Sequence, residues 1–543
     1  MPSAPELRGV WRTDLRARAA YAEGAGIYRI IPSAVAVPAD ADALLALVRW
    51  AASARTPLVL RGAGSAMGGG NVGDGTLVDL TGLRNHALRI DGDRGTARAD
   101  AAVTHGELER AARLDGLRLP PDPSSGRWAT LGGMISTNAS GARTVRYGSV
   151  RAWVDAVEMI TAEGDCLRLA RGVEPATVPA VERFRRDAAP AIMRASERIA
   201  ARFPRTRKNS SGYALDAWLA SGDLLDLVIG AEGTLGVITA ADWRLDRVPE
   251  HRVGLRIALG TMDRFADVIA AVLLHRPSAV ELLDRTFLDL VAPRLPQDVA
   301  AAAAGAEAIV LVELEGHDAD ELRQSAAALT RALRPLATRV DAALGENDAK
   351  RLWEIRHAAS PILAGLPETR RSLQVIEDGC VPVARVGEYI RFARDAAQAR
   401  GLEVVIFGHA GDGHIHVNLL PELARHGWEH EVAALLDEVT GEIVRLGGTP
   451  SGEHGDGRLR ASLLERVYGA EIVELFRLVK NAFDPGAILN PGVIVPDGAA
   501  PIARLKAGAG AVPLPADIAA GLREIERGGG YATQRLALAD RAG

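Results

Sequence analysis

Two glycine-flanked histidine segments constrain this chain more than any other part of its 543 residues. The first runs Gly408-His409-Ala410-Gly411-Asp412-Gly413-His414-Ile415-His416-Val417-Asn418. It predicts a hairpin in which His409 ends one strand, residues 411–413 form the turn and His414 begins the returning strand. Because side chains alternate along a strand, His414, His416 and Asn418 are expected on one face. The turn brings His409 close to that face.

The second segment is Ser451-Gly452-Glu453-His454-Gly455-Asp456-Gly457. Neighbouring side chains on a regular strand point apart, so Glu453 and His454 need the irregular backbone that flanking glycines allow. Two imidazoles and a carboxylate can hold a divalent ion, and one further imidazole can act as a base. A lone histidine is more often a structural hydrogen-bond partner. Histidines around a Gly-Asp-Gly turn, together with a Glu-His pair, favour a metal site.

The composition is that of an ordinary globular protein with two or three domains. Hydrophobic residues make up 48% and charged residues 24%, and the net charge of -5 argues against a general nucleic-acid-binding protein. Cys166 and Cys380 are far apart, so neither an iron–sulfur cluster nor a disulfide framework is predicted. The sequence contains no uncharged apolar stretch of about 18 residues, so no membrane span is predicted. Residues 1–18 contain no apolar run, so no signal peptide is predicted there. We expect a cytoplasmic protein and leave peripheral association with a membrane open.

Helical and strand patterns are mixed along the chain, without an internal repeat. This mixture predicts an α+β fold with helices on one face of a sheet. We expect domain boundaries near residues 248, 425 and 496, followed by a loosely held tail (497–543). Helices are expected at 42–54, 262–275, 320–333, 385–400 and 516–527, and strands at 57–60, 76–80, 155–160, 254–259, 308–314 and 403–407.

A glycine-rich loop, Arg61-Gly62-Ala63-Gly64-Ser65-Ala66-Met67-Gly68-Gly69-Gly70, follows the strand expected at 57–60. Such glycines let backbone N–H groups approach a pyrophosphate closely. The loop is not a Rossmann fingerprint, because its third glycine is misplaced and residues 71–75 cannot start a helix. By itself the pattern slightly favours an ordinary turn over a phosphate site.

Three further segments follow the loop in the chain. They are residues 120–148, which include Ala129-Thr130-Leu131-Gly132-Gly133-Met134-Ile135-Ser136-Thr137-Asn138-Ala139-Ser140-Gly141, residues 230–239 (Gly-Ala-Glu-Gly-Thr-Leu-Gly-Val-Ile-Thr) and residues 483–492 (Phe-Asp-Pro-Gly-Ala-Ile-Leu-Asn-Pro-Gly). With these segments in this order, residues 30–495 resemble the vanillyl-alcohol oxidase and p-cresol methylhydroxylase superfamily of FAD-binding proteins. Residues 208–213 (Lys-Asn-Ser-Ser-Gly-Tyr) and the histidine segments narrow the resemblance to FAD-linked D-2-hydroxyacid dehydrogenases. That group includes D-lactate dehydrogenase, the glycolate oxidase flavin subunit and D-2-hydroxyglutarate dehydrogenase.

The resemblance implies a two-subdomain FAD-binding fold of the p-cresol methylhydroxylase type at 1–248. An α+β substrate (cap) domain with an antiparallel sheet would follow at 249–425, and 426–496 would return to the flavin site. No histidine occupies the first loop, where some relatives attach flavin covalently, so non-covalent FAD is expected. The residues expected around FAD are Arg61, Gly62, Ala63, Gly64, Ser65, Ala66 and Gly68 at the pyrophosphate, Pro121, Thr130, Gly132, Gly133, Ser136, Asn138, Ser140 and Gly141 along the cofactor, Glu232, Gly233 and Val237 at the adenine and ribose, and Asn490 at the isoalloxazine ring. For any single glycine, a turn requirement explains the residue about as well as direct contact.

The resemblance also assigns the histidine segments. In the relatives, the residues matching His409, His416 and Glu453 bind a divalent ion, usually zinc, and the histidine matching His454 is the base. The family usually has asparagine where this chain has His414. That difference leaves open whether His414 is a ligand or only a neighbour of the site.

Several residues of the cap region are further candidates for the substrate site. Asn418 matches a substrate-contacting asparagine. Arg356 resembles the arginine that clamps the substrate carboxylate, which a guanidinium can pair through two hydrogen bonds; an arginine on a helix surface is the alternative. Arg146 and Arg371 are weaker candidates for the clamp. Glu377 and Asp378 resemble part of a cap strand that enters the site, although solvated turn acids would look the same.

These assignments imply an FAD- and metal-dependent dehydrogenase that oxidises a D-2-hydroxy acid, such as D-2-hydroxyglutarate or D-lactate, to the 2-oxo acid. The α-hydrogen would leave as hydride to flavin N5 while His454, neutral near pH 7, takes the hydroxyl proton. The cap segment 375–389 looks closest to the D-2-hydroxyglutarate branch. Without a cysteine-rich module, electrons would pass to a separate acceptor: a quinone, an electron-transfer flavoprotein or an iron–sulfur subunit.

Other functions remain open at this point. One is a glycolate oxidase-type flavin subunit, and another is a non-catalytic FAD-binding subunit of a larger complex, which would not need the histidines. An ether-lipid-forming alkyl transferase is a third, but the run of histidines typical of that enzyme is absent. Direct use of oxygen also stays open, as does the oligomeric state, a homodimer included.

Overall fold

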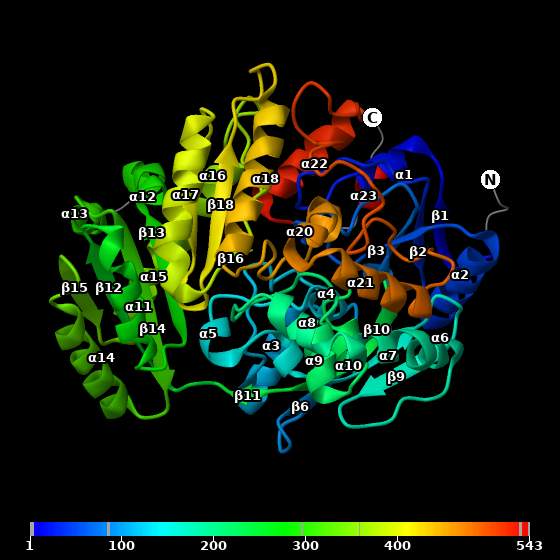
Figure 1. Ribbon diagram of the computed structural model, residues 1–543, viewed down its shortest axis with the longest axis horizontal. Helices are drawn as coiled ribbons and strands as arrows, with labels where there is room; N and C mark the ends of the chain where they lie inside the picture. The colour runs from blue at the N-terminus through cyan, green and yellow to red at the C-terminus, as the bar shows by residue number, and fades with distance from the viewer. Residues whose placement is uncertain (1–4, 84–86, 295–296, 358, 531–534, 541–543) are drawn as a thin grey trace.

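A seven-stranded sheet from the middle of the chain lies beside a part built mainly from the N-terminal half (Figure 1). The computed structural model describes residues 5–83, 87–294, 297–357, 359–530 and 535–540. All strand pairs of the large sheet are antiparallel, as expected for the region 249–425. In spatial order its strands are β15 (Arg339–Ala343), β12 (His251–Leu259), β14 (Ala308–Gly316), β13 (Ala279–Asp284), β17 (Glu403–His409), β18 (His414–Leu420) and β16 (Gly379–Cys380).

The predicted histidine hairpin is formed by β17 and β18. His409 pairs with His414 across the turn, and Gly413 takes a left-handed conformation with φ of 77°. A Cβ on Gly413 would lie 1.9 Å from the carbonyl oxygen of Val381, so both the conformation and the space require glycine there.

Helices cover both faces of the large sheet, not the single face that we expected. Val310 and Val312 of β14 pack into one hydrophobic cluster, while Ile309 and Leu311 pack into another. Apolar residues at consecutive positions of a strand are typical of a sheet enclosed on both sides. One face is covered by α11 (Phe265–Leu273), α14 (Ala319–Leu333), α17 (Val386–Ala399) and α18 (Trp428–Arg445), and the other by α12 (Arg285–Val291), α15 (Glu346–His357) and α16 (Ala359–Ala364).

The described residues of the N-terminal half contain three further sheets, the smallest of which pairs β7 (Leu117–Arg118) with β11 (Asp246–Arg247). The four-stranded sheet has the order β1-β2-β4-β3, and the glycine-rich loop leaves the end of β3 (Leu58–Arg61). The five-stranded antiparallel sheet has the order β5-β6-β10-β8-β9. The other strands and α-helices described in this half are β1 (Gly9–Arg12), α1 (Leu15–Ala20), β2 (Ala34–Pro38), α2 (Ala41–Ala54), β4 (Thr76–Asp79), β5 (Leu88–Asp91), β6 (Thr96–Asp100), α3 (His105–Ala112), α4 (Leu131–Thr137), α5 (Thr144–Tyr147), β8 (Val154–Ile160), β9 (Cys166–Ala170), α6 (Pro179–Arg183), α7 (Ala189–Arg194), α8 (Ser196–Arg202), α9 (Leu215–Ser221), α10 (Leu225–Val228) and β10 (Val237–Arg244).

The chain returns to the N-terminal half after the large sheet. In α21 (Ala470–Phe483), Phe476 packs edge-on against Tyr213, with 5.7 Å between ring centroids. Farther along, the backbone of Leu58 pairs with Ile488 and Asn490, which places the 483–492 segment beside β3. Segments distant in sequence thus meet beside β3, the strand that precedes the glycine-rich loop.

The described part of the C-terminal tail packs through a helix against the N-terminal half, so the expectation of a loosely held tail is wrong for these residues. Its helix α22 (Ala516–Gly528) buries Ile518 and Leu522 in the same cluster as residues of α1. Apolar residues at helical spacing supply that buried face. The helix also contacts α16, which covers one face of the large sheet. It therefore connects the two parts of the molecule. None of the described helices is long and apolar enough to span a membrane.

Candidate active site

A cavity of about 970 Å³ runs from the glycine-rich loop after β3 to the histidine hairpin. This volume is near the upper end for small-molecule sites. All six predicted catalytic and metal-binding residues line it: His454, Arg356, Asn418, His409, His416 and Glu453. It is also lined by fourteen of the predicted cofactor residues, namely Arg61, Gly62, Ala63, Gly64, Ser65, Ala66, Thr130, Gly132, Gly133, Ser136, Ser140, Gly141, Glu232 and Gly233.

Five predicted cofactor residues lie outside the cavity wall: Gly68, Pro121, Asn138, Val237 and Asn490. The side-chain amide of Asn490 donates to the carbonyls of Gly70 and Glu232, so it ties two loops together. A Cβ on Gly68 would lie 2.9 Å from the carbonyl oxygen of Asp456, which explains glycine there by close packing. Direct contact of these five residues with the cofactor stays a prediction.

The loop end of the cavity fits an anionic group. Arg61 is buried, and its Nη2 has no hydrogen-bond partner in the described part of the chain. Burial lowers the pKa of this guanidinium, which an anion beside it would oppose. A Cβ on Gly64 would lie 2.4 Å from the same Nη2, so glycine leaves room at this nitrogen. The pyrophosphate of FAD is a group of the right charge.

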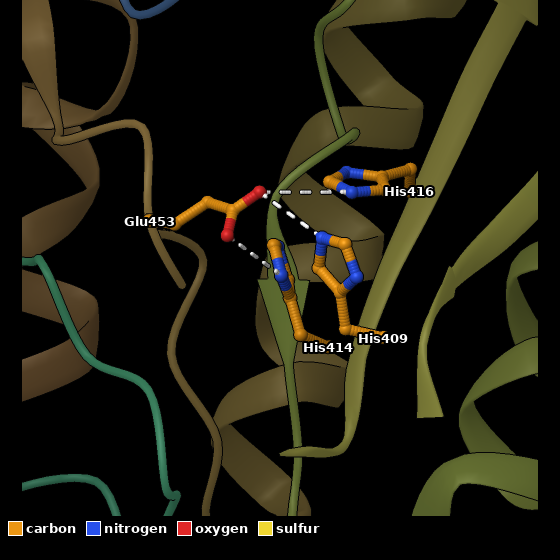
Figure 2. A group of neighbouring side chains, drawn as sticks. All are labelled: His409, His414, His416 and Glu453. Atoms are coloured by element: carbon orange, nitrogen blue, oxygen red, sulfur yellow. Dashed lines mark ion pairs between the residues drawn. The ribbon is translucent and has the colours of Figure 1, made fainter. Parts of the chain in front are cut away.

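At the hairpin end, three imidazoles surround the carboxylate of Glu453 (Figure 2). The Glu453 Oε1 atom lies 3.4 Å from His409 Nε2 and 3.8 Å from His416 Nε2. Ligand atoms on one tetrahedral zinc ion are about 3.4 Å apart when each bond is roughly 2.1 Å. These three groups therefore have the spacing of ligands that share one divalent ion.

The imidazoles of His409 and His416 are each held in place through their second ring nitrogen, Nδ1. His409 Nδ1 lies 2.5 Å from Glu281 Oε1, and His416 Nδ1 lies 2.8 Å from the carbonyl oxygen of Glu377. Such contacts fix the ring and its tautomer, so that Nε2 is presented to an ion. Glu281 was not predicted. The signal for it in the sequence is a glutamate among the apolar residues 279–283 of strand β13 (Ala279–Asp284).

The carboxylate of Glu453 is held by two residues from the N-terminal half. Lys208 Nζ and Ser140 Oγ each donate to Glu453 Oε2 at 2.8 Å. The lysine side chain is only 1% exposed and also lies 3.8 Å from Asp412. Ser140 was predicted as a cofactor residue, and Lys208 appeared only within a motif of the resemblance. Their role in orienting Glu453 was missed because 245 residues separate lysine and glutamate in the chain.

The charges of this cluster suit a cation. Burial alone would raise the pKa of Glu453, but Lys208 and His409 bring it well below the usual value, so the carboxylate is ionised. Burial lowers the pKa of His416 far below its usual range, which keeps this imidazole neutral. Ionised carboxylates and neutral imidazoles are the forms that bind metal. In His409, Glu281 outweighs burial and raises the pKa.

His414 occupies a different position from the other two imidazoles. Its Nε2 lies 2.9 Å from Asp378 Oδ1, and its buried Nδ1 has no hydrogen-bond partner within the described residues. That Nδ1 lies 3.8 Å from Glu453 Oε2, the oxygen already held by Lys208 and Ser140. Since His409 and His416 face the other oxygen, the geometry favours His414 as a neighbour of a three-ligand site.

His454 is positioned by buried acids. Its Nδ1 lies 2.9 Å from Glu377 Oε2, and its backbone N–H donates to Asp378. Burial alone would lower the pKa of His454, but Asp378 and Glu377 raise it to about 10. The protein charges by themselves therefore favour imidazolium, in contrast to the neutral ring expected near pH 7. Both acids are buried, so the solvated-turn alternative for them is wrong.

The structure distinguishes between Arg356 and Arg146 as candidates for binding the substrate carboxylate. Arg356 lines the cavity, with Nε 2.6 Å from Glu281 Oε2 and the guanidinium over the Phe407 ring. Its terminal nitrogens make no hydrogen bond to any residue that the structure describes. Arg146 instead donates to the carbonyl of Glu315 and is not part of the cavity wall.

We predict that Lys208→Met weakens metal binding about 10–100-fold, because it removes the ammonium group that, together with Ser140, holds Glu453 Oε2 in place. Stability should also fall by about 3–5 kcal/mol, since two buried carboxylates lose their cation. Metal titration and urea unfolding measure the two effects. Lys480→Met is the matched control, because it breaks the buried Lys480–Asp484 pair (2.6 Å) away from the cavity. If both variants bound metal equally well, Lys208 would have no orienting role.

The comparisons with known proteins assign the fold and the family. The family described as "FAD binding domain" matches residues 32–170, and that described as "FAD linked oxidases, C-terminal domain" matches residues 248–494. A solved structure of p-cresol methylhydroxylase with substrate bound has a TM-score of 0.64 over 90% of this chain and 94% of that one, at 15% identity. The predicted fold type is confirmed, and these matches define an FAD-linked oxidoreductase.

Curated relatives narrow the class. D-lactate dehydrogenase of Archaeoglobus fulgidus is 31% identical over 85% of this chain and 91% of its own length. Glycolate oxidase subunit GlcD of Bacillus subtilis is 30% identical (86% and 89%), and D-2-hydroxyglutarate dehydrogenase of Xanthomonas citri pv. viticola is 29% identical (85% and 89%). The chain belongs to this family of FAD-linked oxidases and dehydrogenases. The prediction of FAD as cofactor is confirmed at the level of the family.

Proposed function

We propose that this protein oxidises a D-2-hydroxy acid to the 2-oxo acid, and that it uses non-covalent FAD and a divalent ion, for which zinc is the candidate. The observation that carries the proposal is the convergence of His409, His416 and Glu453 in one cavity with the FAD-binding loops. The names of the relatives, which act on D-lactate, glycolate or D-2-hydroxyglutarate, support the substrate class.

The residues of the chain would divide the work as follows. Arg356 and Asn418 bind and orient the substrate from the cavity wall. His454 takes the hydroxyl proton at its Nε2, because Nδ1 is engaged by Glu377. When bound, FAD accepts the α-hydrogen as hydride, and the divalent ion lowers the pKa of the substrate hydroxyl.

The protonation of His454 depends on what lies next to it. Its Nε2 is 3.6 Å from Glu453 Oε1, the atom that would contact the ion. A nearby positive charge disfavours imidazolium and so opposes the effect of Asp378 and Glu377. Binding of the ion would thereby return His454 toward the neutral form that a base requires.

We also propose that a separate acceptor reoxidises the flavin: a quinone, an electron-transfer flavoprotein or an iron–sulfur subunit. The alternative of a non-catalytic FAD-binding subunit is disfavoured by the hydrogen-bonded arrangement of His409, His416 and His454 around the cavity. A subunit without chemistry has no need of such an arrangement.

The proposal predicts that D-2-hydroxy acids bleach the flavin absorbance of the purified protein without oxygen, while their L-enantiomers do so at least about 100-fold more slowly. Stopped-flow spectroscopy under anaerobic conditions with a panel of both enantiomers measures this. Acid treatment should release the flavin from the protein. A flavin that no 2-hydroxy acid reduces would refute the function.

A further inference from the structure

The C-terminal extension forms part of the cavity wall. The matched family domains end at residue 494, yet Arg523, Glu526, Arg527, Gly528 and Gly529 line the same cavity as the histidine hairpin. They lie at the end of α22, whose apolar face is anchored on α1. Figure 1 shows α22 in red, and the helix contacts both α1 of the N-terminal half and α16 beside the large sheet.

Cations are concentrated in this part of the wall (Arg371, Arg523 and Arg527) and directly behind it (Lys506). Arg371, Arg523 and Lys506 all pair with Glu526, the last two at 2.9 Å. Burial alone would raise the pKa of Glu526, but Lys506 and Arg371 bring it to about 2, so it is ionised. Arg527 lies 3.4 Å from Glu368, which also pairs with Arg523 and Arg371. The ion pairs of this cluster thus join two carboxylates, Glu368 and Glu526, to four cationic side chains.

Of the two carboxylates, Glu368 makes the weaker ion pairs. Glu368 is 59% exposed, so solvent screens its pairs with Arg523 and Arg527. An anion that enters from the cavity can compete for these guanidinium groups, which pair with carboxylates through two hydrogen bonds. The excess of positive charge persists after Glu368 and Glu526 are both counted.

The cation cluster adjoins the substrate wall. Leu373 pairs with Leu419 of β18, so residues 371–374 run along the strand that carries Asn418. Ser372 Oγ lies 3.4 Å from Asn418 Oδ1, and Ser372 and Gln374 both line the cavity. A strand advances about 7 Å between His416 and Asn418. An anion bound here would therefore be several bonds away from a hydroxyl at the metal cluster.

We propose that the extension completes the substrate site, and that Arg523 and Arg527, together with Arg371, select a 2-hydroxy acid that carries a second carboxylate. This inference rests on the proposed function and specifies its substrate class. Arg356 and the hairpin would bind the 2-hydroxy acid group of the substrate, and the arginines of the tail would bind its distal carboxylate.

The test compares two substrates of equal chain length, D-2-hydroxyglutarate and D-2-hydroxyvalerate, in which a methyl group replaces the distal carboxylate. Both are given to the holoenzyme with a dye acceptor. The wild type should favour the dicarboxylic acid in kcat/KM, and Arg523→Gln and Arg527→Gln should each lower that preference about tenfold. Arg523→Lys, which keeps the charge, should retain it within about threefold.

Two further measurements keep the test decisive. Arg504→Gln is the control, since it breaks an exposed pair of the tail with Asp74 and lies outside the cavity wall, and it should leave the preference unchanged. Binding of 2-oxoglutarate and 2-oxovalerate, followed by the flavin spectrum, reports the same preference without turnover. Arg527 is half exposed, so Arg527→Gln should fold even where Arg523→Gln does not.

The outcomes separate the two proposals. If both acids reduce the flavin and the preference is absent, or is unchanged in Arg523→Gln and Arg527→Gln, the tail inference is overturned and the function stands. If no 2-hydroxy acid of the panel reduces the flavin but 2-oxoglutarate binds with an arginine-dependent preference, the function fails and the anionic subsite stands.

Discussion

Replacing His454 by glutamine should lower the rate of flavin reduction by about 10²–10⁴-fold, while FAD and metal stay bound. The imidazole lies beside the predicted ligand Glu453 but is held by Glu377, so its loss removes the proton acceptor and leaves Glu453 and its hydrogen bonds in place. Anaerobic stopped-flow traces at saturating substrate measure the rate. Because substrate contacts from Arg356 and Asn418 remain, substrate affinity should change much less than the rate.

The matched control for this variant is His275→Gln. His275 bonds Ser325 at 2.9 Å and is not part of the cavity wall, so its replacement tests the cost of losing a hydrogen-bonded histidine elsewhere. Its flavin reduction should stay within about twofold of the wild type. A His454→Gln enzyme that kept more than about a tenth of the wild-type rate would show that another group takes the proton.

Replacing His416 by alanine should reduce the metal content from about one ion per chain to below about a tenth of that, because a three-ligand site loses one of its ligands. The same result is expected for His409→Ala. Elemental analysis after dialysis against a weak chelator gives the metal content, and the flavin absorbance of the same samples gives the FAD content, which should not change.

His414→Asn provides the comparison within the same hairpin. Because His414 Nδ1 approaches the oxygen of Glu453 that Lys208 and Ser140 occupy, this variant should keep about one ion. Loss of metal in His414→Asn as complete as in His416→Ala would instead show a fourth protein ligand. Full metal content in His416→Ala would remove the basis of the ligand assignment.

Local patterns allowed much of the fold to be predicted. The alternation of His414, His416 and Asn418, with Gly413 in the turn, predicted the β17–β18 hairpin, because strand period and turn geometry depend on neighbouring residues. Helical spacing likewise predicted α14, α17 and α22 close to their observed bounds. The helices on the second face of the sheet were missed, although the consecutive apolar residues of β14 carried that signal.

The groups that support the site could not be predicted in the same way. Lys208 reaches Glu453 across 245 residues, and Glu281 reaches His409 across 128. Nothing in local periodicity links such positions, since their contact depends on how β13, β17 and the loop before α9 pack. From sequence, Glu377 and Asp378 could be either site residues or solvated turn acids. Their burial in the structure decides between these alternatives.

The sequence by itself determined which residue types are available for chemistry: the hairpin imidazoles, the adjacent Glu453 and His454, and the glycine-rich loops. Tertiary structure alone decided which oxygen of Glu453 faces His409 and His416, and which is held by Lys208. It also decided that the end of α22 forms part of the cavity wall. The physical reason is that strand and turn propensities act over a few residues, whereas burial and charge pairing depend on the packing of the whole chain.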